Sequence, residues 1–207
     1  MSLQMSEREA ILERATPEDL MRLFLHKMGA DTGSQHFLKT PERFTKVLYS
    51  YFQTIDLDAV LSDGFADDDP SDGEANEKTL VVQTAIPFMG LCAHHLLPFF
   101  GAAAIGYLPA DRVVGLSKLT RLVYAAGHLS PTTQEHITNL VADTLYGSEA
   151  IKPKGVAVLA SALHGCMAVR GVESPSTRTI TSAVRGDFLE VPALEAKFMT
   201  LAMEGLR

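Results

Sequence analysis

The chain has 207 residues and a hydrophobic fraction of 46%, which is enough for one domain with a substantial core and an appended helical segment. Its formal net charge is −7, from 25 acidic and 18 basic residues, which argues against nucleic-acid or membrane-surface partners because both need excess positive charge. An anionic small molecule needs only a local cluster of cations. No apolar run approaches the roughly 18 residues of a membrane span, and the start lacks the pattern of a secretion signal. We therefore expect a cytoplasmic protein.

The N-terminal part of the chain predicts helices. Apolar positions indicate an amphipathic helix over residues 6–28, with a break at Pro17. A second helix is expected to start with Thr40 as its N-cap and to run on through Phe52, because proline and glutamate follow Thr40 directly. The chain thus divides into three predicted segments: a helical segment at 1–61, a mobile acidic surface loop at 62–78, and a catalytic domain at 79–207.

The rest of the chain predicts pairs of strands on either side of a pair of helices. Strands are expected at 79–86, 99–108, 155–163 and 177–184. Helices are expected at 117–126 with Ser117 as N-cap, at 132–146 ending at Gly147, and at 192–203. Because strands and helices do not alternate regularly, the pattern predicts an α+β fold with an antiparallel sheet.

Both cysteines of the chain stand close to histidines. Cys92-Ala93-His94-His95 places a thiol and two imidazoles within four residues, and His164-Gly165-Cys166 adds one of each. Two cysteines are too few for a disulfide scaffold, which leaves buried thiols with core histidines, a nucleophile or metal ligands. Zinc favours mixed sulfur and nitrogen ligands, and two thiolates with one imidazole leave a fourth position for water. Five candidate side chains exceed the needs of one zinc ion, so some are predicted to do acid–base work.

Several cations and one carboxylate complete the candidate site. The cations are Lys118, Arg121, Arg170 and Arg43. Lys118 and Arg121 are spaced i and i+3 near a predicted helix start, where free backbone N–H groups favour phosphate. Gln134-Glu135 begins another helix, and a carboxylate there can accept two hydrogen bonds from the N1 and N2 edge of guanine. Solvated surface charges and an ordinary acidic first turn are the alternatives.

Together these motifs resemble those of the GTP cyclohydrolase I family over roughly residues 36–188. They occur in the family's order: Thr40-Pro41-Glu42-Arg43, Cys92-Ala93-His94-His95 with Pro98-Phe99, Gly115 to Arg121, Gln134-Glu135, and His164-Gly165-Cys166-Met167 with Arg170-Gly171. The resemblance implies a tunnelling fold, in which an antiparallel sheet carries two helices on one face. It also implies a ring-stacked homodecamer with active sites between subunits.

The same resemblance implies a role for each candidate residue. The implied roles are zinc binding by Cys92, His95 and Cys166, proton transfer by His94 and His164, assistance at the ribose by Ser117, guanine binding by Gln134 and Glu135, and triphosphate binding by Lys118, Arg121, Arg170 and Arg43. The implied reaction opens the purine of GTP by hydrolysis at C8 and releases formate. An Amadori-type rearrangement of the ribose and ring closure then give 7,8-dihydroneopterin triphosphate.

The sequence departs from the family pattern at two places. Ala93 stands where the family has glutamate, and a longer run without arginine connects Tyr124 to Gln134. These departures favour, as an alternative, a divergent cyclohydrolase that uses another purine nucleotide or stops at a ring-opened formamidopyrimidine. A non-catalytic assembly module stabilised by zinc is a further alternative. A zinc nucleobase deaminase is disfavoured, because it needs a glutamate beside the ligand histidine and a Cys-x-x-Cys pair.

Overall fold

The computed structural model describes residues 5–62, 64–66 and 79–206. The chain divides into two compact units, Met1–Ser50 and Tyr51–Arg207, and each is described by itself. Within the described residues, no helix combines the length and the apolar character that crossing a bilayer requires.

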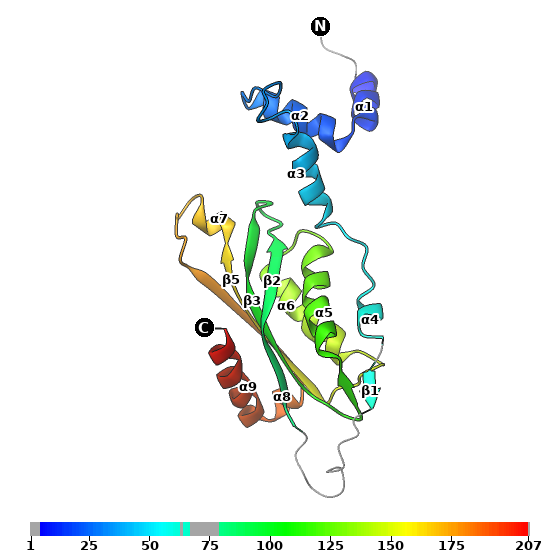
Figure 1. Ribbon diagram of the computed structural model, residues 1–207, viewed down its shortest axis with the longest axis vertical. Coiled ribbons are helices and arrows are strands. Elements are labelled where there is room, and N and C mark those ends of the chain that lie inside the picture. The colour runs from blue at the N-terminus through cyan, green and yellow to red at the C-terminus, as the bar shows by residue number, and fades with distance from the viewer. Residues whose placement is uncertain (1–4, 63, 67–78, 207) are drawn as a thin grey trace, which may run out of the picture. The chain divides into compact units, whose positions relative to one another are not determined.

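The first unit consists of helices α1 (Met5–Arg14), α2 (Pro17–Lys27) and α3 (Thr40–Tyr49), so the predicted break at Pro17 is confirmed (Figure 1). Thr16 caps α2: its hydroxyl accepts from the Asp19 backbone N–H at 3.2 Å, and the Asp19 carboxylate accepts from the Thr16 N–H at 3.0 Å. This reciprocal pair explains why the first helix cannot continue into the second.

The prediction for the start of α3 was wrong by one residue. Lys39 occupies the N-cap, and Thr40 is already helical, with its hydroxyl donating to the His36 carbonyl at 3.3 Å. The helix also ends at Tyr49, before the expected Phe52, and the backbone N–H of the C-cap Ser50 donates to Lys46 and Val47. The adjacent proline lies in the first turn as expected.

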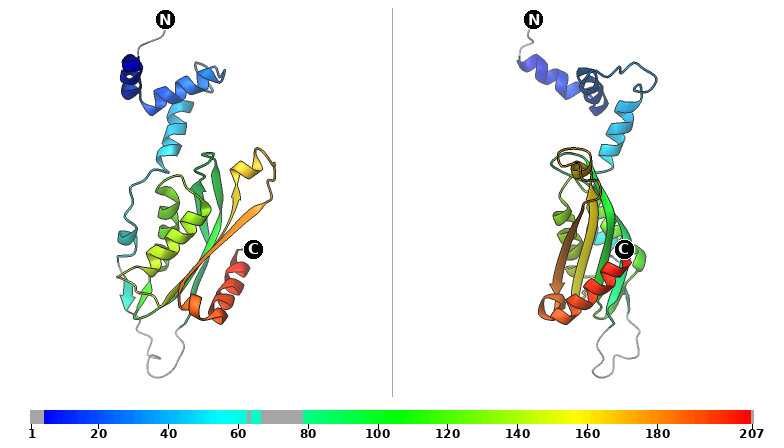
Figure 2. Two further views of the ribbon diagram at one scale, coloured as in Figure 1. Left: turned by 180° about the vertical axis from the view of Figure 1, so that it is seen from behind. Right: turned by 90° about the vertical axis from the view of Figure 1, so that its left-hand side faces the viewer.

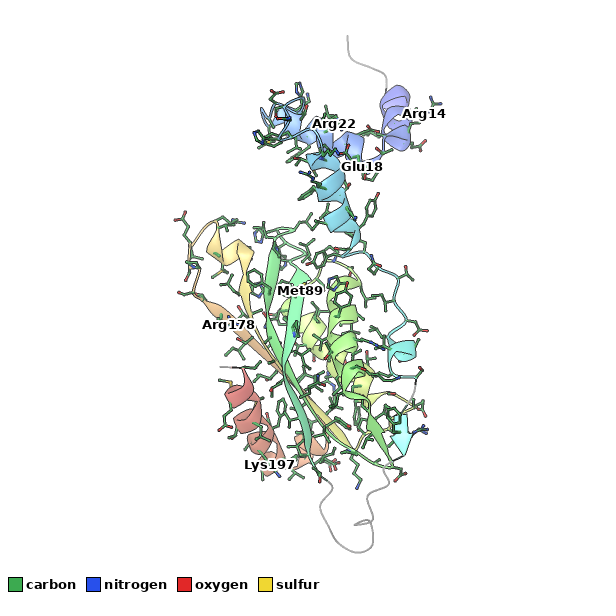
Figure 3. The ribbon with its side chains drawn as sticks, in the orientation of Figure 1. Arg14, Glu18, Arg22, Met89, Arg178 and Lys197 are labelled. Carbon is green, nitrogen blue, oxygen red and sulfur yellow. The ribbon has the colours of Figure 1, made fainter. Side chains whose placement is uncertain are left out.

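Helices α2 and α3 are joined by polar contacts. The Thr45 hydroxyl donates to Glu18 at 2.6 Å, and Arg22 pairs with Glu42 at 3.0 Å. Glu18 and Arg22 both belong to α2 (Figure 3). The hydrogen bond from Thr45 holds the pKa of the Glu18 carboxyl below its usual value.

The second unit is built on an antiparallel sheet, which confirms the predicted α+β class. Its strands among the described residues are β2 (Val81–Leu91), β3 (Pro98–Leu108), β5 (Gly155–His164) and β6 (Arg178–Gly186), in the spatial order β2-β3-β5-β6. A separate pair joins β1 (Gly64–Ala66) to β4 (Arg112–Val114). Residues 64–66 are therefore a strand where a loop was predicted, and 67–78 lie outside the described residues.

Helices cover both faces of this sheet (Figure 2). Helices α5 (Leu116–His128) and α6 (Gln134–Tyr146) pack on one face, and α9 (Pro192–Gly205) packs on the other. Alternate residues of β5 point to opposite faces, so Val158 joins the core beneath α5 and α6 while Leu159 joins the core beneath α9. The short helices are α4 (Leu57–Val60), α7 (Gly165–Ala168) and α8 (Asp187–Glu190).

The starts of the two long helices differ from the prediction. Gly115, and not Ser117, is the N-cap of α5, which makes no side-chain cap hydrogen bond. Helix α6 begins at Gln134, two residues later than predicted, because Thr133 is its N-cap and accepts from the His136 N–H at 3.2 Å. Gly147 ends the helix as predicted.

Helix α5 approaches β2 closely near its C-terminal end. Gly127 allows this approach, because a Cβ at that position would overlap the carbonyl oxygen of Met89. Met89 lies on β2, in the upper part of the sheet in the view of Figure 3. The absence of a side chain at Gly127 thus brings the connection between α5 and α6 near the end of β2.

The sheet has two ends that matter for the site. At one end, Leu91 pairs with Pro98 and Phe99 pairs with His164. At the other end, Leu108 pairs with Gly155, and the chain then continues through β4 into α5. We call these the His164 end and the Gly155 end. Eleven residues of β3 separate them, or roughly 30 Å at the usual rise per residue.

Candidate metal centre

The turn between β2 and β3 carries three of the candidate side chains at the His164 end. The backbone N–H of Cys92 donates to Leu97 at 2.9 Å, and that of Leu96 donates to Cys92 at 2.8 Å. Leu96 has a positive φ of 51°, which closes the turn. Cys92 is therefore buried, whereas His94 and His95 lie on the exposed part of the turn.

Cys166 reaches the same place from the other side of the hairpin. It lies in α7, directly after β5, and β5 pairs with β3 up to His164. The ligand atoms of Cys92, His95 and Cys166 all lie within 4.8 Å of one another, and the Cys92 sulfur lies 3.9 Å from Nδ1 of His95. Bond lengths to zinc place two tetrahedral ligands about 3.5 to 3.8 Å apart. This Cys-His-Cys group therefore fits a metal ion with a small adjustment.

His94 lies beside this group without belonging to it. Its Nδ1 is 3.8 Å from the Cys92 sulfur, and its ring meets that of His95 edge-on at 6.3 Å. Because three ligands leave one position of a tetrahedral ion open, a neighbouring imidazole outside the ligand set is placed to exchange protons there.

The thiol of Cys166 has a raised pKa. Burial raises it most, the neighbouring Cys92 adds to the effect, and the charge of Arg170 opposes it. Without a metal, this thiol therefore stays protonated at neutral pH. Metal binding must displace the proton, so the affinity for a metal falls as pH is lowered.

His164 is held on two sides. Its ring stacks on Phe99, its partner across the strand pair, with centroids 4.8 Å apart and an interplanar angle of 16°. Its Nε2 lies 2.8 Å from Oε1 of Gln134. Burial lowers the pKa of His164, and the charge of Glu135 opposes this shift. The imidazole is therefore neutral at neutral pH.

Gln134 has different partners from the guanine edge that the resemblance implies. Its side chain is 1% exposed, and Nε2 lies within hydrogen-bond distance of Ala160 O, Thr179 O and the Thr181 hydroxyl. Glu135, the next residue, is exposed. The sequence contains a signal for this difference, because Gln134 falls on the same helical face as the buried Ile137.

Thr132 was not singled out from the sequence, yet it contacts the turn between β2 and β3 that carries Cys92, which we call the metal turn. Its backbone forms a parallel bridge with Cys92: the Thr132 N–H donates to Leu91 at 2.9 Å, and the Ala93 N–H donates to Thr132 at 3.2 Å. The run that departs from the family pattern is thus hydrogen-bonded directly to the metal turn. Only tertiary structure shows this, because the contact is made by backbone groups.

His128 of the same run belongs to an aromatic stack in which Tyr51 is also buried and Tyr124 is exposed. The ring of His128 lies between Tyr51 and Tyr124, with centroids 4.8 and 4.0 Å away. Its Nδ1 lies 2.7 Å from the Tyr124 carbonyl oxygen, and so it donates a hydrogen bond there. Neither Tyr51 nor His128 was predicted from the sequence to belong to the site.

The remaining predicted residues are not all brought to the metal group. Ser117, Lys118 and Arg121 lie in the first two turns of α5, where Thr120 accepts from Gln83 of β2 at 3.0 Å, away from the His164 end of the sheet. Arg170 acts electrostatically on Cys166 and so lies near the group. Arg43 belongs to the first unit, where it lines a pocket of about 460 Å³ together with Arg22, Leu38, Lys39, Glu42 and Lys46.

Comparison with known proteins agrees with the motifs. A family model described as GTP cyclohydrolase I matches residues 17–203. The chain is 36% identical to a GTP cyclohydrolase 1 of Hydrogenobaculum sp. over 95% of this chain and 98% of that protein. It is 38% identical to that of Aquifex aeolicus over 92% and 97%, and 40% identical to that of Halalkalibacterium halodurans over 86% and 91%. The chain belongs to the GTP cyclohydrolase I family.

Proposed function

We propose that the protein is a zinc-dependent GTP cyclohydrolase, which opens GTP at purine C8, releases formate and forms 7,8-dihydroneopterin triphosphate. The observation that carries the proposal is the convergence of Cys92, His95 and Cys166 in a member of this family. The names of the relatives give the substrate.

The residues around the group suit such a reaction. When zinc is bound, it lowers the pKa of a bound water to about 7 and thereby supplies a nucleophile at neutral pH. Cys92, His95 and Cys166 hold the ion, and His94 and His164 move protons to and from the opening purine ring. Glu135, exposed at the start of α6, accepts hydrogen bonds from N1 and N2 of guanine. Arg170 binds the triphosphate, and Ser117 of a neighbouring copy assists at the ribose.

We also propose that the active site is completed by a second copy of the chain. Thr120, between Lys118 and Arg121, accepts from Gln83 Nε2 at 3.0 Å, and Gln83 pairs with Ile105 of β3. Ile105 is six residues from Phe99 along β3, or roughly 20 Å. Lys118 and Arg121 therefore lie well away from the metal group of their own chain. A homodecamer with active sites between subunits brings the start of α5 and the metal group together. In the described residues, β2 and β6 stand at the edges of the sheet, where a neighbouring subunit can add its strands.

The divergent alternative has its own structural support. The exposed Ala93 donates its backbone N–H to Thr132, a residue of the departing run, beside the ligands. A different residue at either place changes the surroundings of the metal turn. The alternative therefore predicts a different nucleotide or an earlier stop in the reaction.

The zinc-loaded protein, incubated with GTP, GDP and ATP, distinguishes these proposals. We expect formate and a pterin chromophore to appear together from GTP, with GTP clearly preferred. Formate without a pterin would identify an enzyme that stops at the ring-opened formamidopyrimidine. Preference for another nucleotide would establish the alternative of a divergent cyclohydrolase. The absence of formate from all three nucleotides would refute a cyclohydrolase function.

A further inference from the structure

The hydrogen bonds around Gln134 determine which way its amide points. Its Nε2 faces two main-chain carbonyl oxygens, Ala160 O at 3.2 Å and Thr179 O at 3.1 Å. Carbonyl oxygens only accept hydrogen bonds, so the opposite orientation would bury the Gln134 oxygen against two other oxygens. Burying a polar group in that way is costly. The NH₂ group must therefore face the strands β5 and β6.

Two threonines extend the same network consistently. The Thr138 hydroxyl donates to the Gln134 backbone carbonyl at 2.9 Å, which uses its only hydrogen. In the 2.7 Å contact between the two hydroxyls, Thr181 is therefore the donor and Thr138 the acceptor. The Thr181 oxygen is then left to accept from Gln134 Nε2 at 3.0 Å. The two hydrogens of Nε2 are shared among three acceptors, and the two carbonyl oxygens among these fix the orientation of the amide.

The state of His164 follows from this orientation. Oε1 of Gln134 is an acceptor, and it lies 2.8 Å from Nε2 of His164. Nε2 must therefore carry a hydrogen, and in the neutral imidazole the lone pair resides on Nδ1. No described residue makes a hydrogen bond to that Nδ1. The stacked ring of Phe99 fixes the plane of the imidazole at the same time.

We propose that Gln134 is a positioning residue, which accepts a hydrogen bond from Nε2–H of His164, fixes the ring together with Phe99, and leaves Nδ1 as the nitrogen available to the substrate. This inference rests on the proposed function for the role of Nδ1 toward the substrate, but not for the tautomer.

The same stretch of chain links both halves of the metal centre. Thr132 pairs through its backbone with the residues that flank Cys92, and Gln134, two residues later, holds the imidazole that stands beside Cys166. Thr133 between them caps α6. The start of α6 therefore sets the position of His164 relative to the metal turn.

The test combines a spectroscopic and a kinetic measurement. In protein labelled with ¹⁵N-histidine, the His164 signal is identified by its loss in the His164→Asn variant. We expect a protonated Nε2 and an unprotonated Nδ1 in the zinc-loaded wild type at a pH where the ring is neutral. A protonated Nδ1 in the wild type would overturn the proposal without recourse to any variant of Gln134.

The kinetic part uses Gln134→Met, which is similar in size and has no acceptor for Nε2–H. We expect kcat for formate release to fall about 10- to 100-fold, as when a partner that orients a functional imidazole is removed. The KM for GTP should change little, because Glu135 remains.

Thr181→Val is the matched control, because it removes two hydrogen bonds from the same network without touching His164. It should keep the wild-type tautomer and lose much less activity, although its melting temperature also falls. Equal losses of kcat in the two variants would show that Gln134 acts only on stability and would refute the proposal. Absence of formate from the wild type would instead refute the proposed function and leave the tautomer result standing.

Discussion

Replacing Cys166 with alanine is expected to remove the metal and reduce formate release to background while the protein stays folded. Cys166 provides one of three ligands, and losing a thiolate leaves two donors, which is too few for a zinc site. The side chain is only partly buried in a short helix, so we expect the free energy of unfolding of the metal-free protein to change by no more than about 1 kcal/mol. Zinc content, formate release and a circular dichroism melt measure the three quantities.

His94→Ala is the control for this prediction. His94 is the same type of residue on the same turn, but it lies outside the group of three ligands. We expect this variant to retain its zinc and to lose activity, which separates loss of a ligand from loss of a proton-transfer group. An unfolded Cys166→Ala variant would instead support the alternative of a metal that serves only assembly. Full zinc content in Cys166→Ala would disprove the ligand assignment.

Mixing two inactive variants is expected to restore activity if the site lies between subunits. Lys118→Ala removes a cation at the start of α5, and Cys166→Ala removes a ligand at the His164 end. In an oligomer assembled at random from equal amounts, about one quarter of the sites would receive an intact copy of each. Formate release by the coexpressed pair should therefore approach about a quarter of the wild-type value.

A second pair of variants provides the control for this experiment. Cys166→Ala and His95→Ala both affect the His164 end, so no mixture of the two contains an intact metal group. This pair should stay inactive. If the coexpressed Lys118→Ala and Cys166→Ala pair releases no more formate than the two variants release separately, the start of α5 and the metal group do not meet in one site. In that case the intersubunit proposal fails.

The strands of the sheet could be predicted because they have a clear hydrophobic pattern. The long helices could be predicted because residues typical of helix ends lie near their boundaries. The class of fold follows from the order of these elements, and the predicted strands overlap the observed ones throughout. Helix starts were less accurate. Ser117 was expected as an N-cap because of its residue type, but the helix begins one residue before it, and Gly115 serves instead. Local preference cannot resolve such a shift, since cap positions differ in free energy by only about 1 kcal/mol.

The metal group could be predicted because cysteine and histidine are the residues that zinc selects and the chain holds only two cysteines. The register of β3 with β5 explains why residues so distant in sequence meet: it brings the segment after His164 beside the turn that carries Cys92. The role of Gln134 could not be predicted from its residue type. A glutamine beside a glutamate suggested a polar pair facing one ligand, whereas the helix turns the two side chains in different directions.

Zinc titration of the metal-depleted protein, with formate release from GTP as the readout, tests the account most directly. We predict that formate release is absent without metal, rises with added zinc, and reaches its plateau at about one zinc per chain, because each chain holds one Cys-His-Cys group among its described residues. The Cys166→Ala variant should show no such rise. Full formate release in protein shown to be free of metal would contradict the account.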